Sequence, residues 1–244
     1  MHIIAAARSH IGRRNNNEDA LVVRPDHGLF AVADGMGGYE GGEIAAGIVA
    51  QTLEGFFQRN ADDGEATWPH KLDERFGFVA NELSTAIVLA QRAVLEKKIG
   101  KLEQMGSTVV ALAIDGEMAV IAHLGDSRAY RLRAGVLERL TIDHSYAELM
   151  RAAGGEAPPG FSHVVTRVIG RPDEGPPELR RVELMAGDVY LLCSDGLSDV
   201  LDHDDIHDLL TEYEEPDTAA SALVQDAYLA GGQDNITAIV LRVA

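Results

Sequence analysis

The chain has 244 residues, 46% of them apolar, and it carries a formal net charge of −18 at pH 7. This length and composition allow a substantial core, and no linker, repeat or low-complexity tract divides the sequence, so we expect one domain over residues 1–244. The acidic excess repels phosphate backbones and anionic lipid headgroups, which argues against a nucleic acid partner.

The single cysteine, Cys193, excludes an intramolecular disulfide, and its place in the apolar run VYLLCSD favours a buried, unreactive thiol. No charged and apolar signal region opens the sequence, and no apolar run reaches membrane-spanning length. We therefore expect a cytoplasmic protein without membrane insertion.

Short apolar runs and then helical spacing mark the first third of the sequence. Three strands are expected, at residues 3–8, 20–24 and 28–34. A helix follows, with residues Ile44 to Phe56 at helical spacing, and a second helix is expected near residues 74–98.

Residues 107–140 carry the clearest strand signal, because Asp115-Gly116 and Ala134-Gly135 each separate apolar runs as hairpin turns do. A short helix near residues 146–153 leads into the loop GGEAPPG. Further strands are expected at residues 164–169, 179–184, 189–194 and 236–243, with two helices before the last one. Strands in batches and helices in pairs predict an α+β fold of antiparallel sheets covered by helices.

Acids recur where the predicted strands begin or end. Asp34, Asp126 and Asp195 each follow an apolar run beside a glycine, Asp234 precedes the last strand, and Glu18 and Asp19 precede the strand at residue 20. One Asp-Gly pair is typical of a turn. The repetition indicates that these carboxylates meet at one sheet edge, where their mutual repulsion requires a cation or a bound proton.

The candidate ligands are oxygens, which favours Mg²⁺ or Mn²⁺ over zinc. In FAVADGMGGYEGG, the glycine after Asp34 leaves room for a carbonyl or a metal-bound water to approach. The same stretch matches neither GxGxxG nor GxxxxGK[ST], so a nucleotide-binding loop is disfavoured.

Eight segments resemble, in the same order, the motifs of the metal-dependent serine/threonine protein phosphatases of the PP2C (PPM) family in their compact bacterial form. They are GRRNNNED, VADGMGG, GSTVV, GDSR, LTIDHS, VVTRVIG, LLCSDGLSD and GGQDNIT. The ordered set spans nearly the whole chain and is far more specific than any one segment. The resemblance implies a four-layer α-β-β-α sandwich, with two central antiparallel sheets flanked by helix pairs.

The resemblance also implies a metal site. Asp34 would bridge two Mn²⁺ or Mg²⁺ ions, with the Gly35 carbonyl as a further ligand, and Asp195 and Asp234 would complete the shell of one ion. Glu18 and Asp19 would bind the second ion or its waters, and which of the two contacts the ion directly stays open. Asp126, together with Asp195, would support a weaker third ion.

Arg14 matches the family's phosphate-binding arginine, because it stands five residues before Asp19 in the R-x-x-N-E-D arrangement. Its guanidinium suits a phosphate through two parallel hydrogen bonds. Met36 replaces a histidine that animal members have, so a metal-bound water is expected to protonate the leaving group. His144 is expected to anchor the following helix, and residues 146–164 correspond to the family's flap.

These residues predict hydrolysis of phosphoserine and phosphothreonine in proteins by direct attack of a metal-bridging hydroxide, with Asp34, Asp195, Asp234 and Arg14 as the catalytic set. The expected partners are phosphorylated proteins and a cognate Ser/Thr kinase. Two alternatives stay open, a non-catalytic metal-binding module and a phosphatase of small phosphomonoesters.

Overall fold

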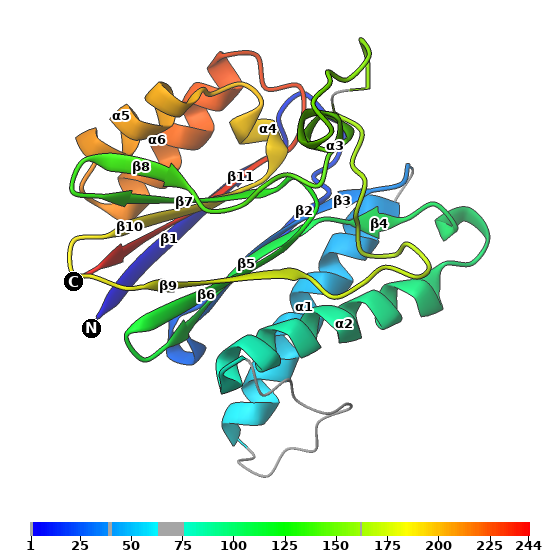
Figure 1. Ribbon diagram of the computed structural model, residues 1–244, viewed down its shortest axis with the longest axis horizontal. Coiled ribbons are helices and arrows are strands. Elements are labelled where there is room, and N and C mark those ends of the chain that lie inside the picture. The colour runs from blue at the N-terminus through cyan, green and yellow to red at the C-terminus, as the bar shows by residue number, and fades with distance from the viewer. Residues whose placement is uncertain (1, 39–40, 63–75, 162) are drawn as a thin grey trace.

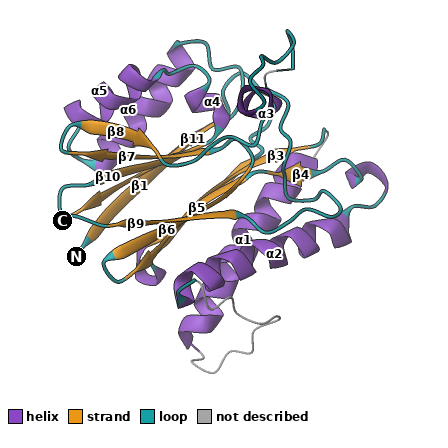
Figure 2. Cartoon of the chain, viewed as in Figure 1, coloured by secondary structure: helices purple, strands orange, loops and turns teal. Residues whose placement is uncertain are grey.

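The computed structural model describes residues 2–38, 41–62, 76–161 and 163–244. Two antiparallel sheets lie face to face, and helices cover both outer faces (Figure 1). Figure 2 shows these layers as two groups of strands between two groups of helices. The predicted four-layer α-β-β-α sandwich is therefore confirmed.

The first sheet has the order β1-β11-β10-β7-β8, so the last strand of the chain lies between the first strand and β10. Its strands are β1 (Ile3–His10), β11 (Ile236–Val243), β10 (Val189–Cys193), β7 (Arg128–Arg133) and β8 (Val136–Arg139). The helices α4 (Asp195–Ser198), α5 (His203–Glu212) and α6 (Pro216–Leu229) lie on its outer side.

The second sheet has the order β2-β3-β5-β6-β9, and a two-residue strand, β4, pairs with β3. Its strands are β2 (Asp19–Arg24), β3 (Leu29–Met36), β4 (Gly106–Ser107), β5 (Val109–Asp115), β6 (Met118–Leu124) and β9 (Glu178–Glu183). The long helices α1 (Gly41–Asp62) and α2 (Phe78–Lys97) cover its outer face. Short helical turns lie at Pro25–His27 and Gly100–Leu102, and α3 (Tyr146–Ala152) stands outside both layers.

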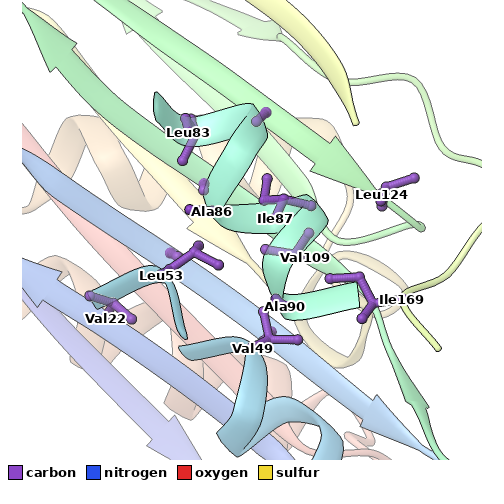
Figure 3. Packing of buried hydrophobic residues seen from close by; sticks show 14 of the residues in the cluster. Val22, Val49, Leu53, Leu83, Ala86, Ile87, Ala90, Val109, Leu124 and Ile169 are labelled. Atoms are coloured by element: carbon purple, nitrogen blue, oxygen red, sulfur yellow. The ribbon is translucent and has the colours of Figure 1, made fainter. Parts of the chain in front are cut away.

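Three apolar clusters fill the spaces between the four layers. In the cluster under α1 and α2, Leu53, Ile87 and Val109 are fully buried and point toward one another (Figure 3). Burying one such side chain stabilises the fold by about 1.5–3 kcal/mol. By length and composition α2 is apolar enough to cross a membrane, but half of it is buried inside the protein, as in a core helix.

Four expectations about the elements need correction. The strand predicted to end at Asp34 continues to Met36, because Gly35 and Met36 pair with β4. No strand forms at residues 164–169; Val165 and Ile169 make isolated bridges to two different segments, so no continuous ladder builds up. Three C-terminal helices replace the expected two, since a four-residue helix begins at Asp195. The second helix begins at Phe78, and the residues before 76 in its predicted range lie outside the described residues.

Candidate metal centre

The predicted acids come from different strands and meet at one edge of the sandwich. Asp34 in β3 lies opposite Asp19 in β2, Asp195 follows β10, and Asp234 precedes β11. A cavity of about 260 Å³ opens there. Seven of the eight predicted site residues line it, namely Arg14, Glu18, Asp34, Gly35, Asp126, Asp195 and Asp234.

Asp19 is the predicted site residue that does not line this cavity. Its Oδ2 accepts hydrogen bonds from Ser194 Oγ at 2.9 Å and from Thr237 Oγ1 at 2.6 Å, so the carboxylate is held between β10 and β11. The neighbouring Glu18 faces the cavity and accepts a hydrogen bond from Asn16 Nδ2 at 3.1 Å. Of the two consecutive acids, Glu18 therefore faces the cavity, whereas Asp19 lies behind the cavity wall.

Burial dominates the electrostatics of the cluster. It raises the pKa of Asp34 well above its usual value, and the charges of Asp19 and Asp195 raise it further. Burial raises the pKa of Asp19 to about 7, although the hydrogen bonds from Thr237 and Ser194 oppose the shift. Burial and then the charge of Asp195 raise the pKa of Asp126 to about 7. The pKa of Asp195 rises to about 6, through burial and then repulsion by Asp199.

The residues present fit a hard divalent cation. Asp19 Oδ1 and Asp195 Oδ1 are buried and have no hydrogen-bond partner among the described residues, although buried carboxylate oxygens are nearly always paired. The surrounding donors are carboxylate and carbonyl oxygens, which suit Mg²⁺ or Mn²⁺. A cation in the cavity would supply a partner for Asp195 Oδ1 and positive charge for the whole cluster.

Arg14 is the cation that enters the cavity from its rim. Its Nη2 lies 2.6 Å from Asp234 Oδ2, and the Arg14 side chain is 58% exposed. Arg13 is also exposed, but it does not line the cavity. A guanidinium that borders the cavity and still reaches solvent is placed to meet an incoming anion.

Gly35 is required by close packing of the backbone. A Cβ at this position would lie 2.0 Å from the carbonyl oxygen of Gly42 in α1 and 2.7 Å from that of Glu18. The Gly35 N–H also donates to the Glu18 carbonyl at 3.1 Å. The sequence predicts this glycine for access to a metal, and the structure shows in addition that no larger residue fits between Glu18 and α1.

Asn235 is a residue of the site that sequence reasoning missed. Its Oδ1 accepts from the Glu18 N–H at 2.8 Å, and its Nδ2 donates to the carbonyls of Ile11 and Asn16, both at 2.9 Å. The side chain therefore fixes the loop that carries Glu18 beside Asp234. The signal available in the sequence was the asparagine of GGQDN, which directly follows a candidate ligand.

Comparison with known proteins agrees with this geometry. Residues 6–230 match the family model of protein phosphatase 2C. The serine/threonine protein phosphatase PstP of Mycobacterium tuberculosis is 36% identical over 98% of this chain, which spans 44% of the PstP length. Protein phosphatase PhpP of Streptococcus pneumoniae is 32% identical over 95% of this chain and 93% of its own length.

Solved structures show the same fold. A crystal structure of M. tuberculosis PstP superposes with a TM-score of 0.85 at 33% identity and covers 99% of this chain and 98% of that one. The catalytic domain of PstP in complex with two manganese ions superposes with a TM-score of 0.79 at 32% identity, covering 99% of both chains. On the family match, the relatives and the shared architecture, this chain belongs to the protein phosphatase 2C family.

Proposed function

We propose that this chain is a metal-dependent phosphatase that hydrolyses phosphoserine and phosphothreonine in proteins. The observation that carries the proposal is the convergence of Asp34, Asp195 and Asp234 on one cavity, with a buried oxygen of Asp195 unpaired among the described residues and Arg14 at the rim. The names of PstP and PhpP, and the two manganese ions of PstP, support the reaction and the metals.

Asp34 would be shared by two Mn²⁺ or Mg²⁺ ions, with Asp195 and Asp234 on one side and Glu18 and the Gly35 carbonyl on the other. When bound, such ions lower the pKa of water enough to supply hydroxide for in-line attack at phosphorus. Asp19 would orient this set from behind, because Ser194 and Thr237 hold its carboxylate below the cavity. Asp126 would hold a third, weaker ion together with Asp195.

Arg14 would bind the equatorial oxygens of the phosphate, where its guanidinium offsets the charge that grows in the transition state. Its present partner, Asp234, lines the same cavity, so an incoming phosphate would compete with this carboxylate for the guanidinium. Met36 lines the cavity but its thioether has no proton to give, and no histidine is among the described residues that line it. The proton for the leaving alkoxide would come from water.

Phosphorylated proteins made by a Ser/Thr kinase would be the substrates. A cavity of about 260 Å³ holds a phosphate and the atoms that link it to a chain, so the rest of a peptide would lie across the rim. A cognate kinase and a cytoplasmic location remain predictions of the sequence.

The test is hydrolysis of a phosphothreonine peptide with Mn²⁺ added, with EDTA, and after Asp195→Asn. We expect activity with Mn²⁺ alone, and both chelation and the substitution should abolish it. Activity that survives both changes would overturn the two-metal proposal, and a correctly folded wild-type chain without activity would favour the non-catalytic alternative.

A further inference from the structure

The segment 146–164 returns to its own starting point beside the metal centre. The Tyr146 N–H donates to the Val164 carbonyl at 2.8 Å, and the Thr166 N–H donates to the His144 carbonyl at 2.7 Å. Val165, between these two bonds, lines the cavity that contains Asp34. The base of the predicted flap is therefore part of the cavity wall.

His144 joins this base to the loop that carries Asp126. Its backbone N–H donates to the Gly125 carbonyl at 2.9 Å, and its ring Nδ1 accepts from the Gly125 N–H at 3.0 Å. Ser145, and not His144, caps α3, since its hydroxyl accepts from the Glu148 N–H. The sequence expectation that His144 anchors this helix is thus wrong in its detail.

The backbone at Gly125 has little room to move. Its φ is +111°, and a Cβ there would lie 2.6 Å from the Thr108 side chain, so the backbone is packed tightly against Thr108, the residue just before β5. Asp126 is the next residue, it is buried, and it lines the cavity. Holding both backbone groups of Gly125 therefore fixes where the Asp126 carboxylate enters the site.

The other edge of the ring is fixed as well. His144 Nε2 lies 3.1 Å from Glu178 Oε1, and the ring stacks on His123, with centroids 4.6 Å apart and planes 2° from parallel. His123 Nε2 in turn lies 2.9 Å from the Ile142 carbonyl. The ring thus has a partner at each nitrogen and a neighbour on one face.

His123, His144 and Glu178 are close enough together to suggest a metal site, but their hydrogen bonds argue against one. Nδ1 of His144 accepts a hydrogen bond from the Gly125 N–H, so in the neutral ring the proton is on Nε2, which donates to Glu178. A metal on Nε2 would move that proton to Nδ1 and set it against the Gly125 N–H. The Arg167 guanidinium, 4.0 Å from the Glu178 carboxylate, already supplies a positive charge.

We propose that His144 is a positioning residue that couples the base of segment 146–164 to the loop presenting Asp126. His144 thereby fixes the positions of both Val165 in the cavity wall and the Asp126 carboxylate. The inference rests on the proposed function where it predicts activity; its structural half stands on the contacts alone.

Two substitutions separate the two edges of the ring. In His144→Asn the side-chain oxygen lies near the former Nδ1 and can still accept from Gly125, while the contact to Glu178 is lost. In His144→Gln the amide reaches the former Nε2 position and leaves the Gly125 N–H unpaired. His203→Gln is the matched control, because His203 bonds the Leu137 carbonyl on the far side of the first sheet.

The experiment measures amide hydrogen exchange at Gly125 and Thr166, together with kcat and KM for a phosphothreonine peptide with Mn²⁺. Losing one buried hydrogen bond should speed exchange at both amides and lower kcat in His144→Gln, each by about tenfold. His203→Gln should stay within about twofold of the wild type, and His144→Asn, which keeps the Gly125 bond and loses only the Glu178 contact, within about threefold. Glu178→Ala, at an exposed position, should speed exchange at Gly125 by about threefold and keeps the test available if His144→Gln does not fold.

Equal loss of kcat in His144→Asn and His144→Gln would overturn the proposal, since it would mean that the ring serves only general packing. Unchanged exchange at Gly125 and Thr166 in both His144→Gln and Glu178→Ala would overturn it too. A wild-type chain without phosphatase activity would instead count against the proposed function, and the exchange rates would still decide the coupling.

Discussion

Two sets of buried aspartates in this protein have opposite surroundings. Asp188 is almost fully buried, and burial alone would raise its pKa, but Arg133 donates from Nε and Nη2 at 2.7 and 2.6 Å and the net pKa is lowered. One carboxylate oxygen of Asp195 is also buried, and burial together with repulsion by Asp199 raises the pKa of Asp195 to about 6. The buried acid Asp188 is neutralised by an arginine, whereas Asp34, Asp126 and Asp195 face one another's charges, and in the cavity only Asp234 is paired with an arginine, Arg14, among the described residues.

The largest effect should come from removing a cavity carboxylate. We expect Asp195→Asn to lower kcat/KM on a phosphothreonine peptide roughly a thousandfold, because a charge that organises the reaction centre is lost. In EDTA at pH 8 the same variant should melt at a higher temperature than the wild type, since an uncompensated charge is gone. A lower melting temperature there would contradict the comparison.

Removing the arginine of a paired acid should have the opposite consequence. Arg133→Met leaves the Asp188 carboxylate buried without its cation, so we expect a loss of about 3 kcal/mol in the free energy of unfolding, measured with urea. Arg131→Met on the same strand is the control, because Arg131 pairs with the more exposed Glu138. Its cost should stay below about 1 kcal/mol, and equal losses in the two variants would remove the distinction between buried and exposed pairs.

Stability without divalent cations should fall as the pH rises. Asp19 and Asp126 have folded-state pKa values of about 7, against 3.8 for the free side chain. Between about pH 4 and pH 7 the folded state therefore binds more protons than the unfolded state, and stability decreases through this window and stays low above it. In EDTA we expect a melting temperature about 5 °C higher at pH 6 than at pH 8.

Saturating Mn²⁺ should reduce this pH dependence, because the bound cation replaces the protons. Thermal unfolding monitored by circular dichroism checks both series. A melting temperature in EDTA that is the same at pH 6 and pH 8 would show that the cavity acids are compensated from within the chain.

The smallest expected effect concerns the two neighbouring arginines. Arg14→Ala should raise KM for a phosphothreonine peptide by about tenfold, through loss of a charge-assisted contact to the phosphate. Arg13→Ala should change KM by less than about twofold, because that side chain lies outside the cavity. Steady-state kinetics decide, and the reverse pattern would show that Arg13 is the phosphate ligand.

The sequence alone predicted the four layers, most strands and the set of converging acids, because these depend on local patterns and on short ordered motifs. It could not predict the hydrogen-bond partners that hold those acids in place. Asp19 is fixed by Thr237, 218 positions away, and Glu18 by Asn235, 217 positions away. Such partners carry no local periodicity, and their roles appear only when β11 enters the sheet between β1 and β10.

The loose pairing of residues 164–169 escaped prediction for a similar reason. An apolar run rich in valine favours a strand, but Val165 meets Ser145 and Ile169 meets Ser107, so the run is shared between two partners. Local sequence likewise points His144 to the nearest helix, because its actual partner, Gly125, lies 19 residues earlier.

The position of β11 in the middle of the first sheet also sets when the centre can form during synthesis. Glu18, Asp19 and Asp34 leave the ribosome early, whereas Asp234 and the strand that orders Asp19 are made after the other strands of both sheets. A nascent chain holds most of the carboxylates without the geometry that gathers them. On the proposed function, metal binding and phosphatase activity would therefore require β11 to be in place.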